Sequence, residues 1–153
     1  MYTREQAAAI RQNFWTRFGK YMSPVLSAEG EKVNWMNYKT GIPNLYFRMN
    51  AGKDEAYIGI EIMHKNPEQA EKYYQQFILL KPMLEEVLGE EWLWEDLHSN
   101  EAFQPMSRIY KTLQPANIFK ESDWPAIISF LKPRLIALDD FWINHKMIFE
   151  MTG

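Results

Sequence analysis

Apolar residues recur at helical spacing in three segments of the chain. The first begins behind a capping box of Thr3 and Gln6, and its apolar face is formed by Ile10, Phe14, Phe18, Tyr21 and Met22. The second starts at Asn66-Pro67 and runs to Gly89, and Pro82 inside it should kink or split the helix. Ser122 opens the third, with Pro125 in its first turn and a kink expected at Pro133. The pattern therefore predicts three main helices.

The third of these helices carries more apolar residues than one face needs. One stripe consists of Trp124, Ile128, Leu131, Leu135, Leu138, Trp142 and Phe149, and an adjacent stripe of Phe130, Phe141 and Ile148. So wide an apolar arc indicates burial on two sides. We expect the first stripe to pack on the sheet and the second to meet Phe14 and Phe18, with contact to a second copy in a homodimer as the alternative.

Strict alternation predicts a β-hairpin. Leu45, Phe47 and Met49 alternate with polar residues, as do Ala56, Ile58, Ile60 and Ile62 around the turn at 51–54. The register that gathers the aliphatic residues sets Met49 opposite Ala56, Phe47 opposite Ile58 and Leu45 opposite Ile60. It also places Tyr46 across from Gly59, with Arg48 and Glu61 together on the opposite, less buried face.

Two further strands are expected at Trp92 to Leu97 and Met106 to Leu113, with a turn at 98–105. The order is then helix, two strands, helix, two strands, helix. It predicts an α+β fold in a single domain over residues 1–153, with a small, mainly antiparallel sheet of about four strands flanked by the three main helices.

Composition narrows the class of protein. The 153 residues are 46% hydrophobic and 15% aromatic, enough for a substantial core, and there is no cysteine for a disulfide or thiolate metal site. A net charge of -3 does not favour nucleic acid as a partner of the whole chain. The N-terminus has no signal-peptide core, and no apolar run is long enough to cross a membrane. These features favour a cytoplasmic protein.

Five segments together resemble a bacterial family, the Domain of Unknown Function 4268 family. In chain order they read RQNFWTRFGKYM, KTGIPNLYFRM, AYIGIEI, LGEEWLWEDL and MSRIYKTL, and they extend over nearly the whole sequence. The family is similar to a domain of longer bacterial proteins, where it can follow a restriction-endonuclease-like region. The resemblance implies a link to DNA-modification or defence systems and no catalytic motif.

That association makes a nuclease centre worth testing in the sequence. Such centres hold a metal with an Asp and an acidic-x-Lys pair on adjoining strands. Glu61 is followed two residues later by Met63, the partner strand offers Arg48 and Asn50, and Asp54 lies in the turn. The pattern fails at two of its three positions. A metal-dependent nuclease centred on Glu61 is therefore the alternative, and a strand with one polar face is the preferred interpretation.

Other catalytic and metal-binding patterns give no site. No two of the histidines (His64, His98 and His145) have the spacing of a helical zinc site, and His145 is expected to be a hydrogen-bonded core or interface residue. Adjacent acidic pairs point in different directions and are typical of solvated surface. No catalytic residue, metal ligand or cofactor is predicted.

The remaining candidate is a binding face on the less buried side of the sheet, made of Tyr46, Arg48, Tyr57, Glu61, Arg108 and Lys111. Aromatic and basic side chains together form platforms for single-stranded nucleic acid, although ordinary cross-strand packing explains the same residues. We therefore expect a binding or interaction module whose partner is a protein or a nucleic acid, and not a membrane. A purely structural dimer is a further alternative.

Overall fold

The computed structural model describes residues 2–99 and 105–152. The expected order of elements and the α+β class are confirmed. The elements are α1 (Arg4–Met22), η1 (Trp35–Asn37), β1 (Leu45–Ala51), β2 (Ala56–Ile62), α2 (Pro67–Leu79), α3 (Lys81–Leu88), β3 (Leu93–Ser99), β4 (Pro105–Leu113), η2 (Glu121–Asp123) and α4 (Trp124–Glu150). The expected turn at 98–105 is shorter than predicted at both ends, and its centre at 100–104 lies outside the described residues.

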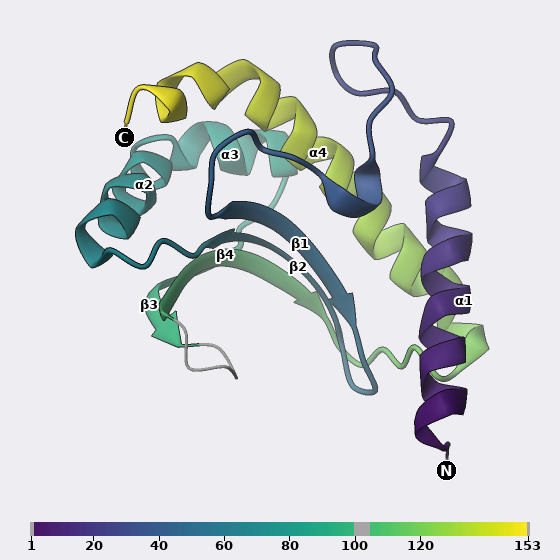
Figure 1. The fold of residues 1–153 in the computed structure, drawn as a ribbon. Helices are drawn as coiled ribbons and strands as arrows, with labels where there is room; N and C mark the ends of the chain where they lie inside the picture. The colour runs from purple at the N-terminus through teal and green to yellow at the C-terminus, as the bar shows by residue number, and fades with distance from the viewer. Residues whose placement is uncertain (1, 100–104, 153) are drawn as a thin grey trace.

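The four strands form one antiparallel sheet in the order β1-β2-β4-β3. The sheet arches, and α2, α3 and α4 lie above the arch while α1 stands beside its hairpin end (Figure 1). No helix of the described residues covers the face under the arch. The sheet therefore has one face packed on the core and one open face, as antiparallel sheets allow.

The hairpin register differs from the prediction by two residues. Met49 pairs with Ile58, Phe47 with Ile60, and Arg48 rather than Tyr46 lies opposite Gly59. The turn is centred one residue later than expected, because the Gly52 amide donates to the Glu55 carbonyl at 2.9 Å and leaves Lys53 and Asp54 as the loop residues. A shift of two residues keeps every side chain on its predicted face. Phe47 and Ile58 are buried as expected.

The termini of the helices follow local chemistry with one exception. The Thr3–Gln6 capping box forms, and Pro82 coincides with the break between α2 and α3. Ser122, in contrast, does not open the last helix. It lies in η2, and α4 begins at Trp124 with Pro125 in its first turn and continues through Pro133.

The second stripe of α4 packs on a different helix from the one predicted. The Phe141 ring lies 6.3 Å from the ring of Phe77 in α2. The α1 residue Phe14 instead meets Trp124 edge to face at 5.5 Å. Ile148 is 40% exposed and joins neither contact. Helix α1 therefore packs on the first turn of α4, and α2 fills the place that the sequence assigned to α1.

A buried carboxylate fixes the long segment between α1 and β1 to α4. Asp139 is 2% exposed and accepts hydrogen bonds from the Ala28 amide at 2.8 Å and from the Tyr38 hydroxyl at 2.5 Å. Burial and then Asp139 raise the pKa of the Tyr38 hydroxyl far above its usual value, so Tyr38 remains a donor. The Trp142 indole donates to the Thr40 carbonyl at 2.8 Å and holds the end of the same segment.

Among the described residues, no helix combines the length and the apolar character that crossing a membrane requires.

Candidate binding face under the sheet

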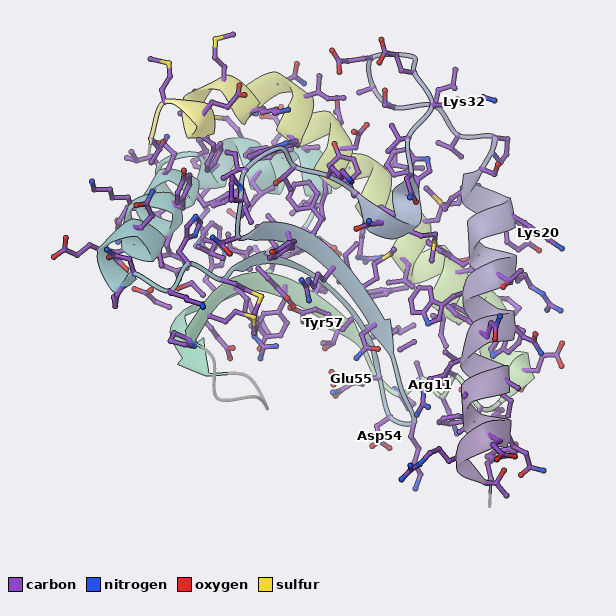
Figure 2. All side chains as sticks on the ribbon, viewed as in Figure 1. Arg11, Lys20, Lys32, Asp54, Glu55 and Tyr57 are labelled. Carbon is purple, nitrogen blue, oxygen red and sulfur yellow. The ribbon has the colours of Figure 1, made fainter. Side chains whose placement is uncertain are left out.

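Strand alternation places polar and aromatic side chains of all four strands on the open face. One cross-strand row consists of Tyr46, Glu61, Arg108 and Glu95, because Tyr46 pairs with Glu61, Glu61 with Arg108, and Arg108 with Glu95. Tyr57 from β2 and Tyr110 from β4 complete what we call the open-face cluster, together with Arg48 of β1. Figure 2 shows Tyr57 beneath the arch, on the side away from the helices.

Gly59 provides the space that the Tyr57 ring occupies. A Cβ atom at Gly59 would lie 2.8 Å from Cζ of Tyr57 and 3.0 Å from Cβ of Tyr110. The ring therefore lies along its own strand over the glycine, and its hydroxyl reaches Glu61 two residues further on. An aromatic ring thus covers Gly59, and it is the ring of Tyr57 and not that of Tyr46, which the predicted register had placed across from the glycine.

Glu61 has both carboxylate oxygens engaged. The Tyr57 hydroxyl donates to Oε2 at 2.8 Å, and Nε of Arg48 lies 3.6 Å from Oε1. Burial and then the Glu61 charge raise the pKa of Tyr57 well above its usual value, which keeps this hydroxyl protonated as a donor. Arg48 and Glu61 share the open face as expected, and the Glu61 side chain is 12% exposed.

Arg108 holds the other half of the cluster together. Its Nε donates to Oε1 of Glu95 at 2.7 Å, and the Tyr110 hydroxyl donates to Oε2 of the same carboxylate at 3.1 Å. The guanidinium lies 3.9 Å from the ring centre of Tyr110 and 5.7 Å from that of Tyr57. Burial is the largest single effect and lowers the pKa of Arg108, but the hydrogen bonds and charges of Glu95 and Tyr57 together outweigh it, and the pKa is raised. A charge held this way is fixed in position.

Lys111 does not join the other five predicted residues. It pairs with Ile58 and so projects from the helix-covered face, where its Nζ lies 3.4 Å from the carbonyl oxygen of Glu91. It lies three positions after Arg108 in the strand, and an odd difference in position places two side chains on opposite faces. Tyr110, two residues from Arg108, takes the place that was given to Lys111.

The prediction missed Tyr110 and Glu95. Tyr110 could have been found, since the alternation in MSRIYKTL already places it beside Arg108. Glu95 could not, because the pairing of β3 with β4 contains an irregularity between Glu95 and His98 that no local pattern indicates.

Among the side chains that the structure describes, which exclude those of residues 97–99, no three histidine or acidic groups are arranged to hold a metal ion. Of the acidic residues weighed for a nuclease centre, Glu61 is paired with Arg48 and Tyr57, and Asp54 lies at the tip of the hairpin (Figure 2).

The open-face cluster is nearly neutral and largely pre-arranged. Two guanidinium groups, Arg48 and Arg108, lie beside two carboxylates, Glu61 and Glu95. The Arg48 guanidinium also lies 4.3 Å from the ring centre of Tyr46, and half of the Arg48 side chain is exposed. Such a surface offers flat aromatic area and oriented polar groups without a net charge.

The sequence comparisons show the family. The family model described as Domain of unknown function (DUF4268) matches residues 10–146 of the 153. The chain belongs to this family, as the resemblance of its segments indicated. No curated protein and no solved structure matches the chain.

Proposed function

We propose that this chain is a protein-binding module whose recognition surface is the open-face cluster. The observation that supports it is the concentration of tyrosine and arginine on a sheet face that no described helix covers (Figure 1). Tyrosine and arginine are enriched where proteins bind one another, because each buries a large area while losing little conformational freedom per contact.

The charge balance favours a protein over a nucleic acid as the partner. Binding a phosphate backbone gains its free energy from cations that replace counterions. Here Arg108 is bonded to Glu95 and Arg48 lies beside Glu61, so each guanidinium faces a carboxylate. A phosphate would compete with these internal partners. A protein surface can instead pack on the tyrosine rings and leave both pairs in place.

We place the partner in a bacterial DNA-modification or defence system of the cytoplasm. This part of the proposal rests on the association of the family with restriction-endonuclease-like regions. The alternative of a metal-dependent nuclease at Glu61 has less support, because the Glu61 oxygens already accept from Tyr57 and face Arg48.

Site-specific photocrosslinking in the native cells tests the proposal. A photoreactive phenylalanine derivative is placed at Thr112, which lies on the open face opposite Tyr57, and at Tyr21, which is 51% exposed on α1. We expect a discrete crosslinked protein from position 112 and none from position 21. Equal crosslinking from both positions, or none from position 112, would contradict the proposal.

A nucleic-acid binding assay tests the competing class of partner. We expect no saturable change in fluorescence anisotropy when the protein is titrated into a labelled 20-nucleotide single strand of DNA or RNA at about 0.15 M salt, the physiological range. Tight, salt-dependent binding that both Arg48→Ala and Arg108→Ala weaken would assign the open face to a nucleic acid instead.

A further inference from the structure

The outer edge of β1 is the second surface of interest, separate from the sheet face. Strand β1 is the first strand in the sheet order and pairs with β2 on one side only. In an antiparallel pair, successive residues direct their backbone N–H and C=O groups alternately toward the partner strand and away from it. Every second residue of β1 therefore directs these groups outward.

The outward-facing residues follow from the bond that closes the hairpin. The Gly52 amide donates to Glu55, which makes 52 and 55 a hydrogen-bonded pair. Alternation then directs the backbone groups of Leu45, Phe47, Met49 and Ala51 outward. Two side-chain contacts agree with this assignment, since Thr40 Oγ1 donates to the Leu45 carbonyl at 2.8 Å and the Ala51 amide donates to Asn50 Oδ1 at 2.9 Å.

The ends of the edge are thus occupied and its centre is not. Leu45 is further held by the hydrogen bond from its amide to the Ile42 carbonyl at 3.3 Å. Within the described part of the chain, the outward N–H and C=O groups of Phe47 and Met49 have no such partner. An unpaired stretch of strand backbone is a template for one more strand.

A cleft of about 310 Å³ runs beside this central stretch. Trp15 of α1 and Met36 of η1 line its outer side. The β1 residues from Tyr46 to Met49 line its inner side. The walls combine an indole ring, two thioether side chains and aromatic rings. The cleft therefore has room and apolar surface for side chains that a neighbouring strand would direct to the helix side of the sheet.

We infer that the β1 edge binds an extended peptide segment of another protein by strand addition, with the pattern apolar-acidic-apolar. The two apolar residues pair with Phe47 and Met49, exchange backbone hydrogen bonds with them, and direct their side chains into the cleft. The acidic residue lies opposite Arg48 on the open face. Half of the Arg48 side chain is exposed there, and only its Nε lies near Glu61, at 3.6 Å, so the contact with Glu61 can remain while the guanidinium meets one more carboxylate.

Charge distinguishes this occupant from a second copy of the chain. In a two-fold pairing of two β1 edges that uses the outward groups of both Phe47 and Met49 in the same register, Phe47 pairs with Met49 and Arg48 lies directly opposite its own counterpart. Like charges directly opposite each other destabilise a strand pair, whereas an acidic residue there adds an attractive partner. The inference goes beyond the proposed face and does not depend on it, since the edge bonds are made by backbone groups.

The test uses a seven-residue synthetic peptide, Ser-Thr-Ile-Glu-Val-Thr-Ser with blocked ends, titrated into the isotope-labelled full chain and followed by NMR. We expect saturable shifts at the Phe47 and Met49 amides. N-methylation of the peptide Ile and Val should reduce binding at least ten-fold, because it removes the amide protons that face β1. Replacement of the peptide Glu by Lys should weaken binding several-fold, and this preference should disappear in Arg48→Met.

A protein variant provides the complementary control. Met49→Pro removes one outward N–H group without removing a bond to β2, and edge strands tolerate proline there. It should abolish peptide binding while circular dichroism stays unchanged, and Met49→Ala should retain binding. If the proline variant does not fold, the N-methylated peptide carries the test alone.

Three results would overturn the inference. The first is no shift at Phe47 and Met49 at millimolar peptide. The second is equal binding of the N-methylated peptide. The third is a shift of the same amides with protein concentration alone, which would assign the edge to a second copy.

Discussion

The Tyr57 ring reaches Glu61 only because residue 59 has no side chain. We predict that Gly59→Ala lowers the free energy of unfolding by roughly 1–3 kcal/mol, the range for forcing extra atoms into a packed site. The new methyl group would lie within 3.0 Å of Tyr57 and Tyr110 atoms and displace the Tyr57 hydroxyl from Glu61. Thermal or denaturant unfolding measures the change.

Two further variants distinguish the loss of this contact from the general effect of replacing a glycine in the hairpin. Gly52→Ala, where an added Cβ meets nothing within 4 Å, should change stability far less. Combining Gly59→Ala with Tyr57→Leu should restore part of the loss, because the obstructing ring is gone. A double variant as unstable as the sum of the two single changes would refute the proposed contact.

His64 predicts a pH dependence of stability. The side chain is 8% exposed and stacks on Tyr73, with ring centres 4.6 Å apart. Burial lowers the pKa of His64 below 6.5, although the Pro43 carbonyl partly opposes the shift. The unfolded chain therefore binds a proton at higher pH than the folded one. Stability is fully present above about pH 6.5, the ordinary histidine value, and is lost as the pH falls through the lower folded value.

Chemical denaturation at pH 8, 6.5 and 5 tests this prediction against His64→Phe, which keeps an aromatic ring beside Tyr73 but cannot be protonated. His98 and His145 are present in both proteins, so their contributions cancel in the difference. The wild type should lose more stability than the variant between pH 6.5 and 5. Parallel profiles across the three pH values would show that His64 is not the group responsible.

At the scale of elements, the contact between α4 and α2 is the one that sequence reasoning assigned to the wrong helix. We predict that Phe141→Ala lowers the free energy of unfolding by about 3–5 kcal/mol, since it leaves a cavity against Phe77. Ile148→Ala, on the same stripe but 40% exposed, should cost much less. Equal losses in the two variants, measured by denaturant unfolding, would mean that α2 does not cover this stripe.

The error has a physical origin. Periodicity identifies which side of a helix is buried but not which neighbour buries it. Phe14 and Phe141 both needed a neighbour in the core. The sequence did not indicate that Phe14 would contact Trp124 and that Phe141 would contact Phe77. The faces of the strands, in contrast, were predictable because alternation has a period of two, and even the two-residue register error left Phe47 and Arg48 on their correct sides.

At the scale of the whole molecule, five residues of the open face could be predicted from alternation, but the connected cluster, which includes Glu95, could not. Alternation within one hairpin placed Arg48 and Glu61 on the same face, and the observed register makes them neighbours. Joining β4 to β2 requires the long-range pairing of Glu61 with Arg108. Lys111 was placed with Arg108 because both are basic, whereas the strand geometry separates them. The face is nearly neutral because each of its two arginines lies beside a carboxylate. The second of these pairs, Arg108 with Glu95, requires the pairing of β3 with β4.

Quantitative affinity capture from the native cells tests the central claim, that the open face binds a protein, most directly. The bait proteins are the wild type, Tyr46→Ala, Thr112→Arg and Tyr21→Ala, the last a matched tyrosine that is 51% exposed on α1. Truncating a tyrosine at the centre of an interface typically costs about 2 kcal/mol, or roughly 30-fold in affinity. We expect a specific protein to be enriched by the wild type and Tyr21→Ala, and lost with both open-face variants while these remain folded. Equal enrichment of that protein by all four baits would contradict the claim.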